Sequence, residues 1–358
     1  MTYESISGIA NQNHYFLLFM DENLITIGFP VYNVERYVKR SLLSALDQDF
    51  PYGYEVLIVD DCGTDTSMEI VKSVCSKHPH RDRIRIIRHN KNKGLGAARN
   101  TIIENATSKY LFFLDSDDWM KSECLSILYN IAEARNAEVV CASSQKEYEG
   151  KEGLLSTYFQ YEDNEWTHDS AGAYAIAQGN FLATTLWNKL FRLDFLKQNN
   201  IRTIHRTCED QWFTYTCWLY ARRVVTLSKF TYCYNIRQNS IMTSMYEKEG
   251  TDETAKVCCD IVSRLFSLIQ QKFNATIGAY DLYYKAIAAN FAILQCANYS
   301  DEQRAYINKI MKHAARRVPS IKKLLNSKNK FIYICSKIYD RPFSFCKYSK
   351  WYEHAFGR

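Results

Sequence analysis

The alternation of apolar runs and amphipathic segments over residues 24–142 limits the fold more than any other feature of this sequence. The apolar runs predict strands over residues 24–29, 55–59, 84–88, 110–114 and 138–142, the first of them ended by Pro30. Helical spacing predicts helices over residues 35–47, 64–77, 94–105 and 121–135. Because the runs are continuously apolar, we expect an α/β fold, a mainly parallel sheet with helices on both faces.

The pattern changes after residue 150. A polar stretch predicts a loop over residues 150–164, followed by helices over 166–183 and 210–220 and a short strand over 224–227. Two later apolar stripes have helical spacing, one through Val257 and Ile261 and one through Tyr283 and Ile287. They predict a C-terminal helical appendage on the sheet domain.

The composition excludes several classes of protein. With 358 residues, 47% of them hydrophobic, the chain can bury a large core and is not expected to be disordered. Its 12 cysteines include no C-x-x-C pair, so we interpret them as small core residues of a reduced protein. No apolar run approaches the ~18 residues of a spanning helix, and no Lys or Arg precedes Arg36. A cytoplasmic location is therefore expected.

Positive charge is concentrated at the C-terminal end. Residues 306–358 contain 13 Lys or Arg and 2 Asp or Glu, interleaved with aromatic residues, although the whole chain has a net charge of only +6. This composition favours contact with an anionic membrane surface. A helix packed through its apolar face with a solvated basic face is an alternative. Single-stranded nucleic acid is the least favoured partner, and none is expected.

Polar clusters follow the predicted strands. Tyr32 and Asn33 follow the first strand, Asp60 and Asp61 end the second, and residues 115–118 (DSDD) follow the fourth. In parallel sheets such strand ends meet at one ligand-binding edge. Two carboxylates two residues apart can hold Mg²⁺ or Mn²⁺ together with phosphate oxygens. A helix N-terminal cluster is the alternative for the DSDD segment.

A glycine-rich segment, KNKGLGAARN, lies at residues 91–100. It is not a dinucleotide fingerprint, because Arg99 stands where a third small residue is needed and the segment does not follow the first strand. The cations Lys93 and Arg99 instead suit a diphosphate.

Four motifs in this order, FPVYN, VDDCGTD, NKGLGAARN and DSDDW, resemble the family 2 glycosyltransferases of GT-A (Rossmann-like) fold. The resemblance extends over residues 24–241 and includes WNKLF, CEDQWF and the segment YCYNIRQNSI. Within this family, the sequence resembles the branch that builds bacterial surface polysaccharides such as capsule and lipopolysaccharide. The resemblance implies inverting, metal-dependent transfer of a sugar, from a UDP-linked hexose or N-acetylhexosamine, to a hydroxyl of a lipid-linked glycan. It further implies an enzyme on the inner face of the plasma membrane.

The resemblance also implies roles for single residues. Pro30, Tyr32, Asp60 and Asp61 would hold uracil and ribose, Arg237 would lie near the diphosphate, and Asp115 and Asp117 would form the metal motif, with Asp117 the direct ligand. Asp210 would be the general base, with Glu209 as its rival. Apart from the resemblance, His205 is a candidate accessory metal ligand, although a lone histidine is more often a surface or core residue. Trp187 and Lys189 would shape the acceptor side, although Trp187 suits the core equally well. Cys62 departs from the family, which usually has Gly there.

The domains expected from these observations are an N-terminal extension (1–23), a catalytic domain (24–241), a helical extension (242–315) and a basic aromatic tail (316–358). The catalytic domain divides into a nucleotide-binding half (24–150) and an acceptor half (151–241).

Two other classes of protein share parts of this sequence pattern. A non-catalytic membrane- or nucleic-acid-binding module is disfavoured by the complete set of acids. A nucleotidyltransferase usually has a glycine-rich loop after its first strand, where FPVYNVERY stands here.

Overall fold

The computed structural model describes residues 23–204, 208–238, 240 and 252–273, together with residues 276, 278, 279, 282, 283 and 286. The predicted extension up to residue 22, most of the second half of the helical extension and the whole basic tail lie outside the described residues. The predicted domain boundaries therefore remain predictions.

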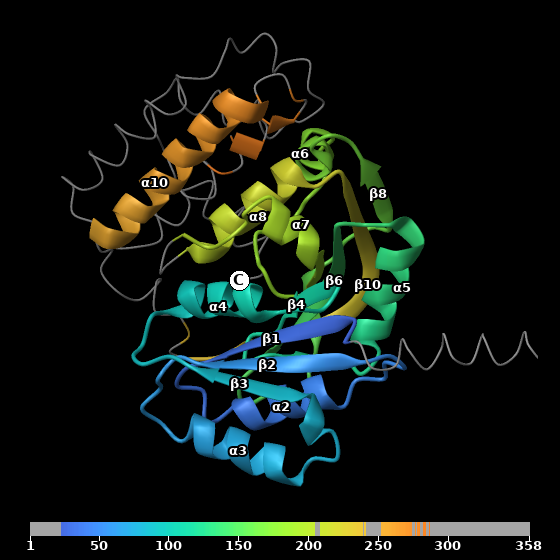
Figure 1. Ribbon diagram of the computed structural model, residues 1–358. Coiled ribbons are helices and arrows are strands. Elements are labelled where there is room, and N and C mark those ends of the chain that lie inside the picture. Colours follow the sequence, from blue (N-terminus) through green and yellow to red (C-terminus); the bar gives the residue numbers. More distant parts are fainter. Residues whose placement is uncertain are drawn as a thin grey trace, which may run out of the picture.

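The first half of the chain forms the parallel part of one central sheet, in the order β3-β2-β1-β4. Its strands are β1 (Ile25–Val31), β2 (Tyr54–Asp60), β3 (Ile84–Arg88) and β4 (Tyr110–Phe113). Helices α2 (Val38–Leu46) and α3 (Ser67–Lys77) cover one face, and α4 (Leu95–Asn105) lies on the other (Figure 1). The strands and helices predicted for this half are confirmed.

Pro30 does not end the first strand as predicted. β1 continues through Val31, and Pro30 pairs in register with Val59 of β2. The carbonyl of Gly28 accepts from Leu114 on the β4 side, and the carbonyl of Val31 accepts from Asp61 on the β2 side. The side to which the backbone N–H and C=O groups point alternates along a strand, so those of Pro30 point to the β4 side. Since β4 has already ended at this level, the missing N–H of Pro30 costs no ladder hydrogen bond.

The second half makes the sheet mixed. β9 (Lys189–Arg192) runs antiparallel between β4 and β6 (Val139–Tyr148), and β10 (Arg223–Ile236) runs parallel to β6. The remaining strands pair antiparallel at the margins: β5 (Trp119–Met120), β7 (Ser156–Phe159) and β8 (Asn164–Thr167). The predicted α/β fold is confirmed, but the sheet is mixed: β1–β4 and the β6–β10 pair are parallel, whereas β5, β7, β8 and β9 pair antiparallel.

The helices of this half are α5 (Cys124–Arg135), α6 (Ala171–Ala177), α7 (Leu193–Gln198), α8 (Glu209–Tyr220) and α10 (Asp252–Leu268), with a short turn η1 (Arg81–Arg83) earlier in the chain. Helix α10 continues into a π-helical turn η2 (Ile269–Phe273) and lies beside α8 (Figure 1). The predicted helices over 121–135 and 210–220, and the stripe through Val257, are confirmed.

Two predictions for this half are wrong, and a third gives a strand that is too short. The expected loop over residues 150–164 contains β7, the expected helix over 166–183 is a strand up to Thr167 and helical only in α6, and the expected short strand is the 14-residue β10. The physical reason is pairing: β8 lies along β10, and the polar end of β10 lies along β6, so neighbours far away in sequence decide these elements.

The prediction that the cysteines are small core residues holds for most of those that the structure describes. All nine described cysteines are unpaired, and six are buried: Cys124, Cys141, Cys217, Cys233, Cys258 and Cys259. Within the described part of the chain, no helix has the length and apolar character needed to cross a membrane.

Candidate active site

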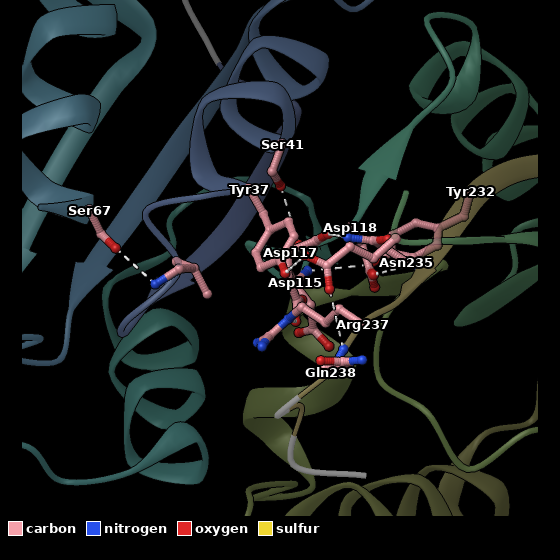
Figure 2. Close-up of polar contacts among 12 residues, drawn as sticks. Tyr37, Ser41, Ser67, Asp115, Asp117, Asp118, Tyr232, Asn235, Arg237 and Gln238 are labelled. Atoms are coloured by element: carbon pink, nitrogen blue, oxygen red, sulfur yellow. Dashed lines mark hydrogen bonds and ion pairs between the residues drawn. The ribbon is translucent and has the colours of Figure 1, made fainter. Parts of the chain in front are cut away.

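Three aspartates gather at the turn that follows β4, and we call Asp115, Asp117 and Asp118 the acid cluster (Figure 2). The Asp118 N–H donates to the Asp115 carbonyl at 3.0 Å, which closes the turn between β4 and β5. The Ser41 hydroxyl, from α2, donates to the same carbonyl at 3.2 Å. The turn is therefore held at the C-terminal edge of the sheet, where ligands bind in folds of this kind.

Asp118 fastens this turn to β10. Its Oδ2 accepts from the Tyr232 hydroxyl at 2.7 Å and its Oδ1 from the Asn235 N–H at 2.8 Å. The same hydroxyl accepts from the Asp115 N–H at 3.3 Å. Burial raises the pKa of Asp118 well above its usual value, and the charges of Asp117 and Asp115 raise it further. Asp118 thus shapes the turn from inside the protein, where 2% of its surface is exposed.

Asp117 pairs with Arg237, the first residue after β10. The Arg237 Nε donates to Oδ2 at 2.8 Å, and the Asn235 side chain donates to the Asp117 carbonyl at 3.2 Å. The guanidinium also lies 5.0 Å from the centre of the Tyr37 ring, a cation–π contact (Figure 2). Burial raises the pKa of Asp117, and Arg237 opposes this. The structure therefore brings together Asp117 and Arg237, two of the residues identified from the sequence.

Arg99 joins the acid cluster to the second half of the chain. One terminal nitrogen donates to Asp115 Oδ1 at 2.7 Å and the other to Glu209 Oε1 at 2.6 Å. The side chain is buried, with 3% of its surface exposed. Burial by itself lowers the pKa of Arg99, but the two carboxylates reverse this, and the net shift is upward. A guanidinium that stays charged thus holds β4 and the start of α8 at a fixed spacing.

Asp210 follows Glu209 in the first turn of α8. Burial and the charge of Glu209 raise the pKa of Asp210, the charge of Arg99 opposes them, and the net value is about 7. Among the described residues no Lys or Arg pairs with the Asp210 carboxylate, whereas Glu209 pairs with Arg99. Of the two rival bases, Asp210 is therefore the one whose carboxylate is not engaged by a cation.

Asp61 directly follows β2 and binds the protein's own backbone. Its carboxylate accepts from the Lys93 N–H and the Gly94 N–H, both at 2.8 Å, and lies 2.6 Å from Nδ1 of His89. The other ring nitrogen of His89 lies 2.9 Å from the Thr101 hydroxyl. Only 2% of Asp61 is exposed. Its position indicates that it holds the segment that leads into α4.

The neighbouring Asp60 has a similar local role. Its Oδ1 accepts from the Cys62 N–H at 3.0 Å, and its Oδ2 lies 3.3 Å from Nε of Arg88. Cys62 has a φ of 56°, in the left-handed region that glycine adopts without steric cost. This explains in physical terms why glycine is usual at this place in the family that the motifs resemble.

The other residues expected at the nucleotide side lie around this edge. Tyr32, directly after β1, is 45% exposed, and Lys93 is exposed, whereas Pro30 is buried within β1. Val31 pairs in register with Asp60, so the ends of β1 and β2 are adjacent. The Tyr32 ring is thus the exposed aromatic surface at this end of the sheet.

The residues expected on the acceptor side are both buried. Trp187, 6% exposed, stacks on Tyr232 with ring centres 4.8 Å apart and on Tyr234 at 5.7 Å. Lys189 donates to the carbonyl of Thr185 at 2.6 Å, and burial lowers its pKa. Trp187 thus occupies a core position, the alternative foreseen for it. His205 lies outside the described residues.

The carboxylates of the acid cluster are the candidate ligands for the predicted Mg²⁺ or Mn²⁺. Within the described residues, no three His, Cys, Asp or Glu side chains come together as a ready-made metal site. Each of Asp115 and Asp117 uses one carboxylate oxygen for an arginine, and both side chains are about one-fifth exposed, at 21% and 22%. Two partly exposed carboxylates fit a cation that takes its remaining ligands from water and substrate phosphates, as Mg²⁺ usually does.

Sequence reasoning missed several residues of this site. Asn235, Tyr232 and Tyr37 contact the acid cluster or Arg237, and His89 contacts Asp61. Tyr232 and Asn235 stand inside the YCYNIRQNSI motif, which was the available signal. For Tyr37 and His89 the sequence carries no signal, because only the fold brings them to their partners.

This mixed sheet, with carboxylates at the C-terminal ends of its strands, has the GT-A architecture of nucleotide-sugar transferases. The structure of TarS 1–349 from S. aureus in complex with UDP-GlcNAc matches 82% of this chain and 87% of that one, with a TM-score of 0.56 at 23% identity. The mannosyltransferase PcManGT from Pyrobaculum calidifontis, solved with GDP-Man and Mn²⁺, matches 89% of this chain and 87% of that one, with a TM-score of 0.50 at 14% identity.

The chain belongs to glycosyl transferase family 2, whose sequence model matches residues 26–208. It is 28% identical over 235 residues to the glycosyltransferase GlyA of Streptococcus pneumoniae, covering 63% of this chain and 32% of GlyA. It is 29% identical over 222 residues to the Staphylococcus aureus poly(ribitol-phosphate) beta-N-acetylglucosaminyltransferase TarS, covering 61% and 36%. The putative glycosyltransferase EpsH of Bacillus subtilis is 28% identical over 235 residues, covering 64% and 65%. The matches span about a third of the length of GlyA and TarS.

Proposed function

We propose that this protein is an inverting, metal-dependent glycosyltransferase. It moves a hexose or N-acetylhexosamine from a UDP-sugar to a hydroxyl of a growing, lipid-linked surface glycan. The observation that carries the proposal is the bridge from Asp115 through Arg99 to Glu209. It fixes a metal-binding acid cluster beside a carboxylate, Asp210, that is suited to accept a proton.

The donor would lie across the C-terminal ends of β1, β2 and β4. Tyr32 and Asp60 border the place for the base and ribose, and Lys93 and Arg237 supply positive charge for the diphosphate. UDP is supported by the matched TarS structures, which were solved with UDP and with UDP-GlcNAc.

Asp117 and Asp115 would hold Mn²⁺ or Mg²⁺. When bound, the cation neutralises the charge that develops on the leaving diphosphate. Arg237 and Arg99 hold one oxygen of each carboxylate in place, which leaves the other oxygen of each available to a cation. The arginines also limit the repulsion between carboxylates in the absence of the cation.

Asp210 would take the proton of the acceptor hydroxyl. A general base works best when its pKa is close to the working pH, and burial raises that of Asp210 to about 7. Attack from the side opposite the diphosphate inverts the anomeric carbon. The relative TarS is named as a beta-transferase, which agrees with inversion of an α-linked UDP-sugar.

We further propose peripheral attachment to the inner face of the plasma membrane through residues 316–358. The support is the composition of that tail, basic and aromatic, which suits anionic lipid headgroups. Cosedimentation with anionic liposomes tests it: removal of residues 322–358 should abolish binding, and unchanged binding would refute the attachment.

The test of the reaction is UDP release from a panel of UDP-sugars, with Mn²⁺, with Mg²⁺ and with chelator. Slow release from one sugar, lost with chelator and lost in Asp210→Asn, is the expected result. If no sugar is turned over and no nucleotide shifts the melting temperature, the protein is instead a non-catalytic module on this fold.

A further inference from the structure

A buried lysine near the end of β6 lacks an acidic partner. Lys146 is 7% exposed, and its ammonium lies 5.6 Å from the ring centre of Tyr148 and 5.9 Å from that of Tyr158. Within the described part of the chain it forms neither an ion pair nor a hydrogen bond. The stem of the side chain is buried, whereas the ammonium nitrogen, flanked by the two aromatic faces, can be reached from outside the chain. An anion from outside the chain would supply the missing partner.

Lys146 lies at the same edge of the sheet as the acid cluster. β6 is parallel to β10, and both β6 and β4 are antiparallel to β9, so the C-terminal ends of β4, β6 and β10 coincide. In the ladder, Lys146 pairs with Tyr234 of β10 and with Ser156 of β7. Tyr234 directly precedes Asn235, whose N–H binds Asp118. Lys146 is thus close in the fold to the catalytic edge.

The lysine lies further along the sheet than the ladder partner of Tyr232. Tyr232, which contacts the acid cluster, pairs with Ser144, and Tyr234, two residues further along β10, pairs with Lys146. Same-face neighbours on a strand are about 7 Å apart. Lys146 is therefore one such step along the sheet from the ladder partner of Tyr232, and it also borders β7.

Stacked aromatic rings lie between Lys146 and the acid cluster. The Tyr234 ring lies 4.9 Å from that of Tyr158 and 5.7 Å from that of Trp187, and both pairs are stacked. Beyond them Phe159 lies 5.5 Å from Phe181, which is 46% exposed. Sites for organic ligands combine such apolar walls with a few polar groups that fix orientation.

We propose that Lys146, between Tyr148 and Tyr158, binds a phosphate group of the acceptor. The inference rests on the proposed function and adds to it the chemical class of the acceptor, a phosphate ester. An ammonium is a compact point charge that suits one phosphate oxygen. The phosphate could belong to a polyol-phosphate chain or to the diphosphate of a lipid carrier, which present the same chemistry to the lysine.

The test is calorimetric binding of three probes in the presence of UDP and Mn²⁺. The probes are a synthetic ribitol-phosphate tetramer, a short-chain prenyl-diphosphate sugar and a neutral oligosaccharide of similar size. The variants are Lys146→Gln and Lys146→Arg. The matched control is Lys151→Gln, which removes an exposed lysine of the β6–β7 turn. Thermal unfolding checks that each variant is folded, and Lys146→Met replaces Lys146→Gln if that variant is not.

We expect Lys146→Gln to weaken binding of at least one phosphate probe at least tenfold, Lys146→Arg to stay within threefold, and Lys151→Gln to match the wild type. The probe that loses affinity identifies the source of the phosphate. Equal affinity of the wild type and Lys146→Gln for both phosphate probes would overturn the inference, as would an equal loss for the neutral oligosaccharide. Because binding is measured without turnover, failure here is separate from failure of UDP release.

Discussion

Two groups of aspartates follow β2 and β4, the two strands that flank β1, yet they have different partners. After β2, Asp61 gives its carboxylate to the backbone N–H groups of Lys93 and Gly94 and to His89. After β4, Asp115 and Asp117 give one oxygen each to an arginine side chain and stay partly exposed. An acid at a strand end is therefore not in itself a ligand site. The contrast separates a group that builds a loop from one suited to a cation.

The largest effect should come from the acid cluster. Asp117→Asn removes a negative charge next to Arg237 and one proposed metal ligand. We expect transfer to fall by about 100-fold to 1,000-fold, because charge development on the leaving diphosphate loses its stabilisation. Initial-rate UDP release measures this, with Asp169→Asn, a change of an exposed aspartate, as the control. Full activity with normal metal dependence would remove Asp117 from the metal site.

The next effect concerns pH. Asp61 is surrounded by N–H donors, whereas burial raises the pKa of Asp210 to about 7. A base must be unprotonated, so kcat/KM should fall below pH 7, by roughly 50-fold between pH 7 and pH 5. The Asp210→Asn variant should show low activity without this decline. A decline that persists in the variant would assign the titration to another group.

The same shift acts on stability with a definite sign. The folded state binds a proton at Asp210 more tightly than the unfolded chain, whose Asp has a pKa near 3.9. The free energy of unfolding should therefore fall as pH rises from about 4 to about 7, and this contribution should be absent in Asp210→Asn. Urea denaturation at several pH values measures the difference between wild type and variant.

A smaller effect on activity is expected at the loop-building aspartate. Asp61→Asn keeps the shape but places an amide N–H against a backbone N–H that needs an acceptor. We expect the free energy of unfolding to fall by about 1–3 kcal/mol and the donor KM to rise, with kcat reduced less than tenfold. Urea denaturation and steady-state kinetics measure both. A 1,000-fold loss of kcat at unchanged stability would instead group Asp61 with the acid cluster.

The sequence allowed much of this comparison to be foreseen. The parallel half could be predicted because its strands are continuous apolar runs, and the residues of both acidic groups were identified from the motifs. The partners could not be predicted. Arg99 meets Asp115 and Glu209 from positions 16 and 110 residues apart in the chain. Similarly, β8, β9 and the polar end of β10 are strands only because distant strands pair with them.

The smallest effect lies in the turn that carries Asp61. Cys62 has a φ of 56°, and no residue of the 115–118 turn is among the positive-φ residues of the described chain. A side chain in this conformation costs about 1 kcal/mol, but the Cys62 thiol also donates to the His89 carbonyl at 2.7 Å. In Cys62→Gly the relief of strain and the lost bond nearly cancel, so stability should stay within about 0.5 kcal/mol of wild type.

Replacement of Cys62 by alanine separates the effect of the backbone strain from that of the lost thiol hydrogen bond. Cys62→Ala keeps the strained φ and loses the thiol bond, so it should be less stable than Cys62→Gly by about 0.5–1 kcal/mol. At Ser116, inside the acid-cluster turn, the order should reverse, since glycine there only adds freedom to the unfolded chain. Urea denaturation of the four variants decides the matter. Alanine more stable than glycine at both positions would show that the β2 turn is not strained, and this part of the contrast would be lost.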